Sequence, residues 1–76
     1  MKLPILSAHK IIKILEKEGF QVLRQKGSHI SLYKKTKKKT LLVVVPNKKE
    51  IKIGTLIGIL KQSNLTREEF LDLLKE

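Results

Sequence analysis

The sequence predicts an α+β fold: one three-stranded antiparallel sheet with helices on one face, in the order α-β-β-β-α plus a short C-terminal helix. Segments with helical apolar spacing stand towards both ends of the chain, and three short runs rich in Val, Ile and Leu stand between them, separated by turn residues. The 76 residues are expected to make a single domain, residues 1–76. Because the chain has no cysteine, its core must come from apolar packing without disulfides.

Capping residues predict where the helices begin and end. A first helix is expected from Ala8 to Glu18, because Ser7 is a good N-cap, apolar residues follow at helical spacing and Gly19 supplies a left-handed stop. The apolar residues between positions 56 and 60 predict a second helix. The sequence Thr66-Arg67-Glu68-Glu69 is a capping box and predicts a last amphipathic helix after it.

Three strands are expected between the helices. Residues 20–25 and 30–34 flank the Gly27-Ser28 turn and predict a hairpin. The β-branched run 41–45 follows a lysine-rich loop, residues 34–40, and predicts the third strand. Consecutive strands joined by short turns pair antiparallel, so the three strands form one sheet.

The second predicted strand has two different faces. A period of two places Ile30 and Leu32 towards the core, whereas His29, Ser31 and Tyr33 share the other face. A sheet that is covered on one side only leaves this other face open to a ligand.

Positive charge is concentrated in the middle of the chain. The net charge is +10, and the segment from Arg24 to Lys61 holds eleven Lys and Arg residues against the single Glu50. Such a field attracts polyanions, so a nucleic acid is the expected partner. An anionic membrane is the weaker alternative, because the lysines lie in strands and turns rather than along one face of an amphipathic helix.

The chain has no feature of an exported or membrane protein. No apolar run approaches the roughly 18 residues that a membrane span needs, and the N-terminus lacks the apolar block of a signal peptide. With no cysteine to indicate an oxidising compartment, a cytoplasmic protein without a membrane partner is expected. No metal or other cofactor is expected either, because the two histidines are twenty positions apart and the carboxylates are scattered.

The segment Lys26-Gly27-Ser28-His29 places a histidine directly after a Gly-Ser turn, inside the basic part of the chain. Metal-free RNA cleavage needs a base for the ribose 2′-hydroxyl, cations around the phosphorane and an acid for the leaving 5′-oxygen. His29 is the only central side chain that can perform both proton transfers near neutral pH. From the residues alone, a catalytic role and a role as an RNA-contacting or incidental surface histidine both stay open.

Residues around this histidine are candidates to bind RNA. Lys26 and Lys34 can neutralise a phosphate, Arg24 can bind one through two hydrogen bonds, and Tyr33 can stack on an unpaired base. Ser28 is expected to shape the turn. A purely solvated charge for the basic residues, and packing at the sheet edge for Tyr33, are the simpler alternatives. The expected RNA-binding residues are Arg24, Lys26, Ser28, Tyr33, Lys34 and Lys35.

Several separated segments together resemble the HicA toxin family of bacterial and archaeal toxin–antitoxin systems. They agree in order and spacing over nearly the whole chain: Gly19-Phe20, Arg24-Gln25-Lys26-Gly27-Ser28-His29, Val45-Pro46, Gly54-Thr55-Leu56, Ile59-Leu60-Lys61-Gln62 and Leu65-Thr66-Arg67-Glu68-Glu69-Phe70.

The resemblance implies a fold similar to a double-stranded RNA-binding domain, an mRNA interferase activity (an endoribonuclease that cleaves mRNA) and a HicB-type antitoxin as partner. The family's catalytic histidine follows Gly-Ser, which corresponds to His29. Many members have a second histidine at the next position, which is Ile30 in this chain, and Asn47 stands where a histidine often follows Val-Pro.

Two other functions use the same features. One is a non-catalytic RNA-binding module of the double-stranded RNA-binding type, which the order α-β-β-β-α itself resembles. The other is an interaction subunit whose basic surface meets an acidic protein. A catalytic histidine distinguishes the nuclease from both, because neither alternative needs acid–base chemistry.

Overall fold

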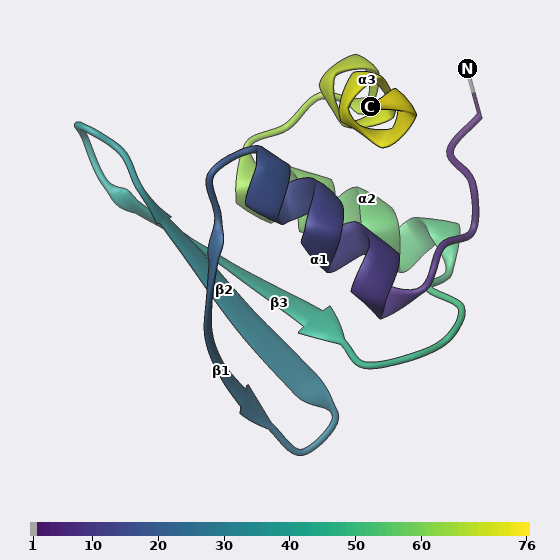
Figure 1. Ribbon diagram of the computed structural model, residues 1–76, viewed down its shortest axis with the longest axis horizontal. Helices are drawn as coiled ribbons and strands as arrows, with labels where there is room; N and C mark the ends of the chain where they lie inside the picture. The colour runs from purple at the N-terminus through teal and green to yellow at the C-terminus, as the bar shows by residue number, and fades with distance from the viewer. Residues whose placement is uncertain (1) are drawn as a thin grey trace.

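The computed structural model describes residues 2–76 and confirms the predicted α+β fold. Three antiparallel strands form one sheet in the spatial order β1-β2-β3, and three helices accompany it (Figure 1). The elements are α1 (Ala8–Lys17), β1 (Gln21–Lys26), β2 (His29–Lys35), β3 (Thr40–Pro46), α2 (Ile53–Ser63) and α3 (Arg67–Lys75).

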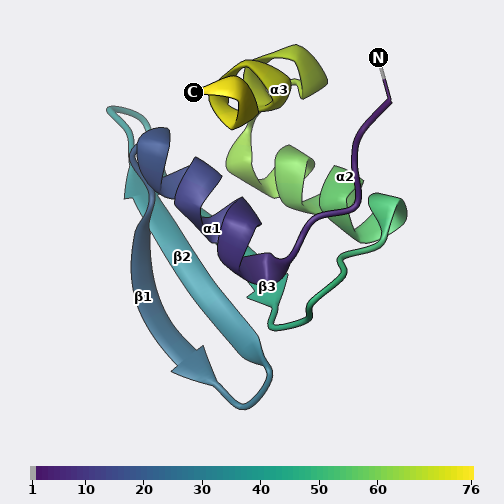
Figure 2. The same cartoon turned by 45° about the vertical axis from the view of Figure 1, so that its right-hand side comes forward.

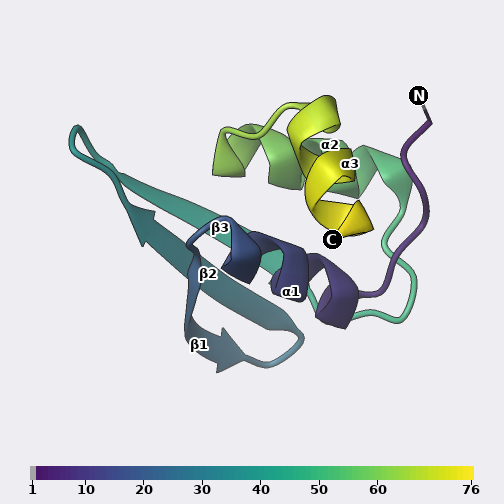
Figure 3. The same cartoon turned by 45° about the horizontal axis from the view of Figure 1, so that its top comes forward.

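The helices lie on one side of the sheet in two layers. Figures 1 and 2 show α1 and α2 next to the sheet, with α3 lying over both of them on the side away from the strands. Figure 3 shows the β2–β3 hairpin extending beyond the helices at its loop end. Strand β1 is the sheet edge that the helices do not cover, and all six of its residues are exposed.

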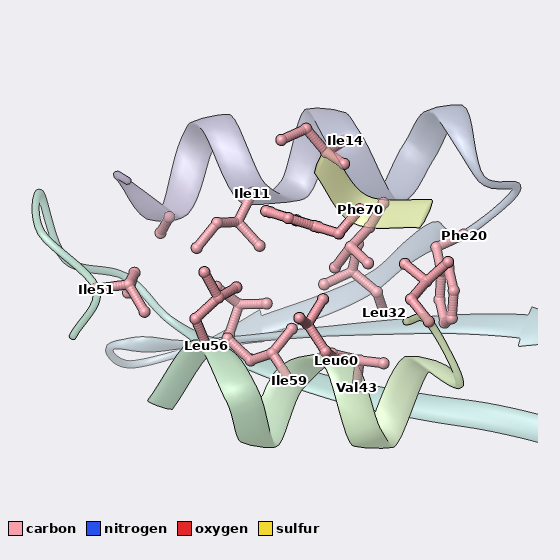
Figure 4. Packing of buried hydrophobic residues seen from close by; sticks show 14 of the residues in the cluster. Ile11, Ile14, Phe20, Leu32, Val43, Ile51, Leu56, Ile59, Leu60 and Phe70 are labelled. Atoms are coloured by element: carbon pink, nitrogen blue, oxygen red, sulfur yellow. The ribbon is translucent and has the colours of Figure 1, made fainter. Parts of the chain in front are cut away.

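The core lies between the sheet and the two inner helices. Leu32 and Val43 are partners in the β2–β3 register and are fully buried beneath the side chains of α1 and α2 (Figure 4). Phe70 of α3 is 0% exposed and points between α1 and α2, so the C-terminal helix completes the core. This packing explains why the acidic last helix is part of the fold.

Helix α1 ends in a Schellman motif. Gly19 has a φ of 109°, which favours glycine, and its N–H donates to the carbonyl of Glu16. The N–H of Phe20 donates to the carbonyl of Leu15, and both side chains are buried. The predicted stop at Gly19 is therefore confirmed. Phe20 belongs to this motif, so β1 begins one residue later than the sequence predicted.

Helices α2 and α3 are separated by a short turn. Asn64 ends α2 in the left-handed conformation, at φ 59°. The predicted capping box then starts α3: the N–H of Glu69 donates to the Thr66 hydroxyl at 3.1 Å, and the N–H of Thr66 donates to the Glu69 carboxylate at 2.9 Å. None of the helices among residues 2–76 is long and apolar enough to cross a membrane.

The capping box predicts a pH dependence of stability. The hydrogen bond from the Thr66 backbone N–H holds the pKa of the Glu69 carboxyl below its ordinary value of 4.5, and the Thr66 hydroxyl adds to this effect. Since the pKa is lower in the folded state, the stabilisation is present above pH 4.5 and is lost as pH falls through the lowered pKa. In the Glu69→Gln variant, the free energy of unfolding should therefore fall less steeply as pH is lowered below 4.5, as measured by urea titration at a series of pH values.

The control for this measurement is Glu68→Gln, which removes a neighbouring carboxylate from the first turn of α3 and leaves the capping box intact. That variant should keep the acidic limb of the wild-type curve. An acidic limb that is the same for Glu69→Gln and the wild type would contradict the prediction.

Candidate nucleic-acid interface

His29 is the first residue of β2 and lies at one end of the sheet. It is paired with Lys26 of β1 on one side and with Pro46 of β3 on the other. The next residue, Ile30, is buried against the helices, so the imidazole of His29 lies on the opposite face and is exposed. An exposed imidazole beside a lysine can exchange protons with a ligand that docks at this end.

The turn before His29 is fixed by its backbone conformation. Gly27 has a φ of 59°, whereas Ser28 does not have a positive φ, which is the pattern of a type II′ hairpin turn. The carbonyl of Ser28 accepts a hydrogen bond from the N–H of Asn47 at 2.6 Å. The turn is therefore attached to the segment that follows β3.

The face of the sheet that the helices leave uncovered, called the open face below, carries both polar and apolar side chains. In the β1–β2–β3 register, Arg24 and Val44 flank Ser31. Leu42 and Val44 are 59% and 42% exposed, which is high for aliphatic side chains in a strand. The residues of the open face are Gln21, Arg24, Lys26, His29, Ser31, Tyr33, Lys35, Thr40, Leu42, Val44 and Pro46.

Tyr33 lies further along the open face. Its hydroxyl donates to the side-chain oxygen of its β1 partner Gln21 at 3.0 Å. Four residues separate Tyr33 from His29, which is about 13 Å along a strand. A base stacked on Tyr33 would therefore lie away from a phosphate at His29, within the same bound strand.

The structure does not bring Lys34 to the open face. Lys34 lies on the side of the sheet that faces the helices, where its ammonium is 3.2 Å from the carboxylate of Glu18 and 5.9 Å from the centre of the Phe20 ring. These contacts join β2 to the end of α1, so the arrangement favours a structural role for this lysine. Local sequence patterns do not indicate this contact, because Glu18 is sixteen residues away from Lys34.

Lys35 and the lysine-rich loop stand at the far end of the sheet. Lys35 is six residues beyond His29 on β2, a separation of about 20 Å. The structure therefore brings Arg24, Lys26, Ser28 and His29 together at one end of the sheet, and separates Lys35 from them.

Two lysines near His29 were not among the sequence-predicted site residues. Lys48 and Lys49 follow β3, and the hydrogen bond between Asn47 and Ser28 holds this segment against the turn before His29. The signal was present in the predicted topology, because antiparallel pairing brings the end of the third strand beside the start of the second. Among residues 2–76, no three side chains of His, Cys, Asp or Glu come together in a way that could hold a metal ion.

The conformation of the turn predicts the effect of a substitution at Gly27. No atom lies within 4 Å of the position that a Cβ would occupy, so Gly27→Ala meets backbone strain and no steric clash. Because φ is positive, this variant should lower the free energy of unfolding by about 1 to 2 kcal/mol, as measured by urea titration. Gly27→Asn should lose less, since Asn is among the residues that occupy the positive-φ position of type II′ turns. Equal stability of Gly27→Ala and the wild type would contradict the assigned turn.

The chain matches the model of a known protein family. A family model described as "HicA toxin of bacterial toxin-antitoxin" matches residues 8–65, from the start of α1 to just after α2. A search among individually curated proteins gives no match. The matched region covers more than half of the 76 residues and contains the whole sheet. The chain therefore belongs to the HicA family and is the toxin of a toxin–antitoxin pair.

Proposed function

We propose that this toxin is a metal-independent endoribonuclease that cleaves mRNA, with His29 as its general acid and base. The observation that carries the proposal is the exposed imidazole of His29 beside Lys26, at the end of an open sheet face in a chain of net charge +10. Membership of a toxin family supports it, because cleavage of mRNA stops protein synthesis. RNA is then the substrate, and the cytoplasm is where the enzyme meets it.

The chemistry that fits this site is transesterification within the RNA. His29 removes the proton of a 2′-hydroxyl, the 2′-oxygen forms a bond to the adjacent phosphorus, and the bond from phosphorus to the 5′-oxygen breaks. The protonated imidazole then gives its proton to the leaving 5′-oxygen. The products carry a 2′,3′-cyclic phosphate and a 5′-hydroxyl, and no cofactor is consumed. Lys26, directly opposite His29, is the nearest cation in the register to stabilise the phosphorane.

The rest of the open face suits a bound RNA strand. Arg24 lies two residues before Lys26 on the same face and can bind a neighbouring phosphate through two hydrogen bonds. Tyr33 can stack on an unpaired base, a contact worth roughly 1 to 3 kcal/mol. Ser28 holds the turn, and Lys35 attracts the strand from the far end of the sheet. Lys34 has no role in this proposal, because its ammonium is paired with Glu18.

The antitoxin is proposed to be of the HicB type and to block this surface. The exposed aliphatic side chains of Leu42 and Val44 lie on the open face, and a protein that covered them would remove apolar surface from water. Carboxylates on the same partner would pair with Arg24 and Lys26. Such a complex would close the site without any change in the fold of the toxin.

A non-catalytic RNA-binding module is the second candidate. It is favoured by the order of the elements and by the surroundings of His29, since the following residue, Ile30, is buried and adds no second acid–base group. Binding through the open face alone would require the basic residues and Tyr33 but no histidine. The two candidates differ in whether RNA is cut.

Cleavage in the presence of EDTA tests the proposal. Purified toxin should cut RNA in EDTA and leave 2′,3′-cyclic phosphate ends. His29→Ala should still fold and bind RNA, because the side chain is exposed, but its cleavage rate should fall by at least about a hundredfold. His9→Ala, which removes the other exposed histidine from α1, is the matched control and should cut at the wild-type rate. Binding of RNA by the wild type with no cleavage would favour the non-catalytic module.

Expression in cells tests the toxin function separately. The wild type should arrest growth and the His29→Ala variant should not, although both accumulate to the same level. Co-expression of the neighbouring gene for the antitoxin should restore growth, and the two proteins should then purify as a complex. Growth arrest by the His29→Ala variant at equal protein level would mean that toxicity does not depend on this histidine.

A further inference from the structure

Three segments meet at the end of the sheet where His29 lies. The N–H of Asn47 donates to the carbonyl of Ser28 at 2.6 Å, which joins the segment after β3 to the β1–β2 turn. The N–H of Ala8 donates to the carbonyl of Lys48 at 2.9 Å, which joins the same segment to the start of α1. Figures 1 and 2 both show the β1–β2 turn, the end of β3 and the start of α1 at this end of the molecule. The backbone of Lys48 therefore has a fixed position relative to His29.

This end of the molecule is strongly basic and its cations are free. We call it the basic end, and it consists of Lys26, Lys48, Lys49 and Lys52, with Glu50 as the single acidic residue of the segment between β3 and α2. All four lysines are exposed. Within residues 2–76 the only ion pair is that of Lys34 with Glu18, so none of these four ammonium groups is paired. Unpaired, solvated lysines can bind an anion without first breaking an ion pair.

The segment after β3 also has a concave surface. A shallow hollow lies against the beginning of α2, and its lining combines the ends of two elements with the lysines between them. It is lined by Pro46, Lys48, Glu50, Ile51, Lys52 and Thr55. A phosphate in or beside this hollow would lie within reach of the flexible lysine side chains. A lysine ammonium acts as a point charge, so it binds a phosphate whatever the bases on either side of it.

The other group of lysines has a different place. Lys37, Lys38 and Lys39 lie in the β2–β3 hairpin loop, about 25 Å from His29 along the strands. This loop adds to the field that attracts RNA, but its lysines cannot touch the phosphates next to a ribose that reacts at His29. Of these two groups of lysines, the basic end is the one that can hold those phosphates.

We propose that the basic end is a docking surface for the RNA backbone, in which Lys48 and Lys49 bind phosphates adjacent to the one at His29. This inference rests on the proposed RNA substrate and adds residues outside the open face to its binding site. The RNA strand then crosses the end of the sheet over the β1–β2 turn instead of lying only along the strands. Contacts of this kind are independent of base sequence and weaken as salt concentration rises.

The experiment compares two double variants with equal charge change. Lys48→Ala with Lys49→Ala removes two cations from the basic end, and Lys37→Ala with Lys38→Ala removes two from the distant loop. Both are made in the His29→Ala background so that RNA stays intact, and binding of a short fluorescent oligouridylate is measured over a series of salt concentrations. Circular dichroism checks that both variants are folded.

The variant of the basic end should bind roughly tenfold more weakly at physiological salt, and the slope of log K against log salt should fall by about 1.4, or 0.7 for each lost phosphate contact. The loop variant should keep the slope of the parent protein. Equal effects of the two variants would overturn the proposal, because they would show a general field without localised contacts. Unchanged RNA binding by the basic-end variant together with a weaker antitoxin complex would also overturn it and assign these lysines to the protein partner.

The outcome is independent of whether the protein cuts RNA. A weaker and less salt-dependent complex for the basic-end variant would support the docking surface even if the wild type proved to be non-catalytic. Conversely, cleavage that depends on His29 but not on Lys48 or Lys49 would leave the proposed nuclease intact and remove this surface from it.

Discussion

The antiparallel pairing of β2 with β3 is the constraint on which the rest of the structure depends. Its register sets Ile30 opposite Val45 and Leu32 opposite Val43, so β2 and β3 bury one continuous apolar face beneath the helices. The same register ends at His29 and Pro46. A shift of one residue would turn every buried side chain outwards and would point His29 into the core. The fold and the position of the histidine are therefore fixed by one set of backbone hydrogen bonds.

Because the helices cover only one face of the sheet, the other face and the outer strand β3 stay exposed to solvent. Strand β3 is an outer strand whose exposed backbone groups could pair with another chain, and two of its side chains, Leu42 and Val44, are apolar and exposed. The side chain of Gln62 on α2 accepts a hydrogen bond from the N–H of Val44 at 3.2 Å. Gln62 thus satisfies one backbone N–H donor in the middle of this edge strand. The open face stays accessible for a ligand or a partner protein.

Features that depend on residues close together in the sequence were predictable, whereas contacts between residues far apart in the sequence were not. Helix ends were readable because Ser7, Gly19 and the Thr66 capping box act through the backbone within a few residues. The two faces of β2 were readable from its alternating pattern. The ion pair of Lys34 with Glu18 depends on how α1 is oriented over the sheet, so local patterns leave Lys34 as a candidate RNA-binding residue. The position of the segment with Lys48 against the Ser28 turn follows from pairing between strands, so local spacing does not predict it.

The proposed site consists of charge and exposure rather than of an enclosed cavity, and this limits how it can act. His29 and the lysines of the basic end lie on the surface, where water and salt screen each electrostatic contact. Affinity must then come from several phosphates bound at once, because a single exposed ion pair contributes at most about 1 kcal/mol. A strand that is held at both the open face and the basic end has its backbone bent over the turn at His29. Such bending would help a 2′-hydroxyl align with the adjacent phosphate on the 3′ side of the same ribose, an alignment that a stacked A-form helix prevents. The docking of phosphates on either side of His29 would therefore itself favour the reaction.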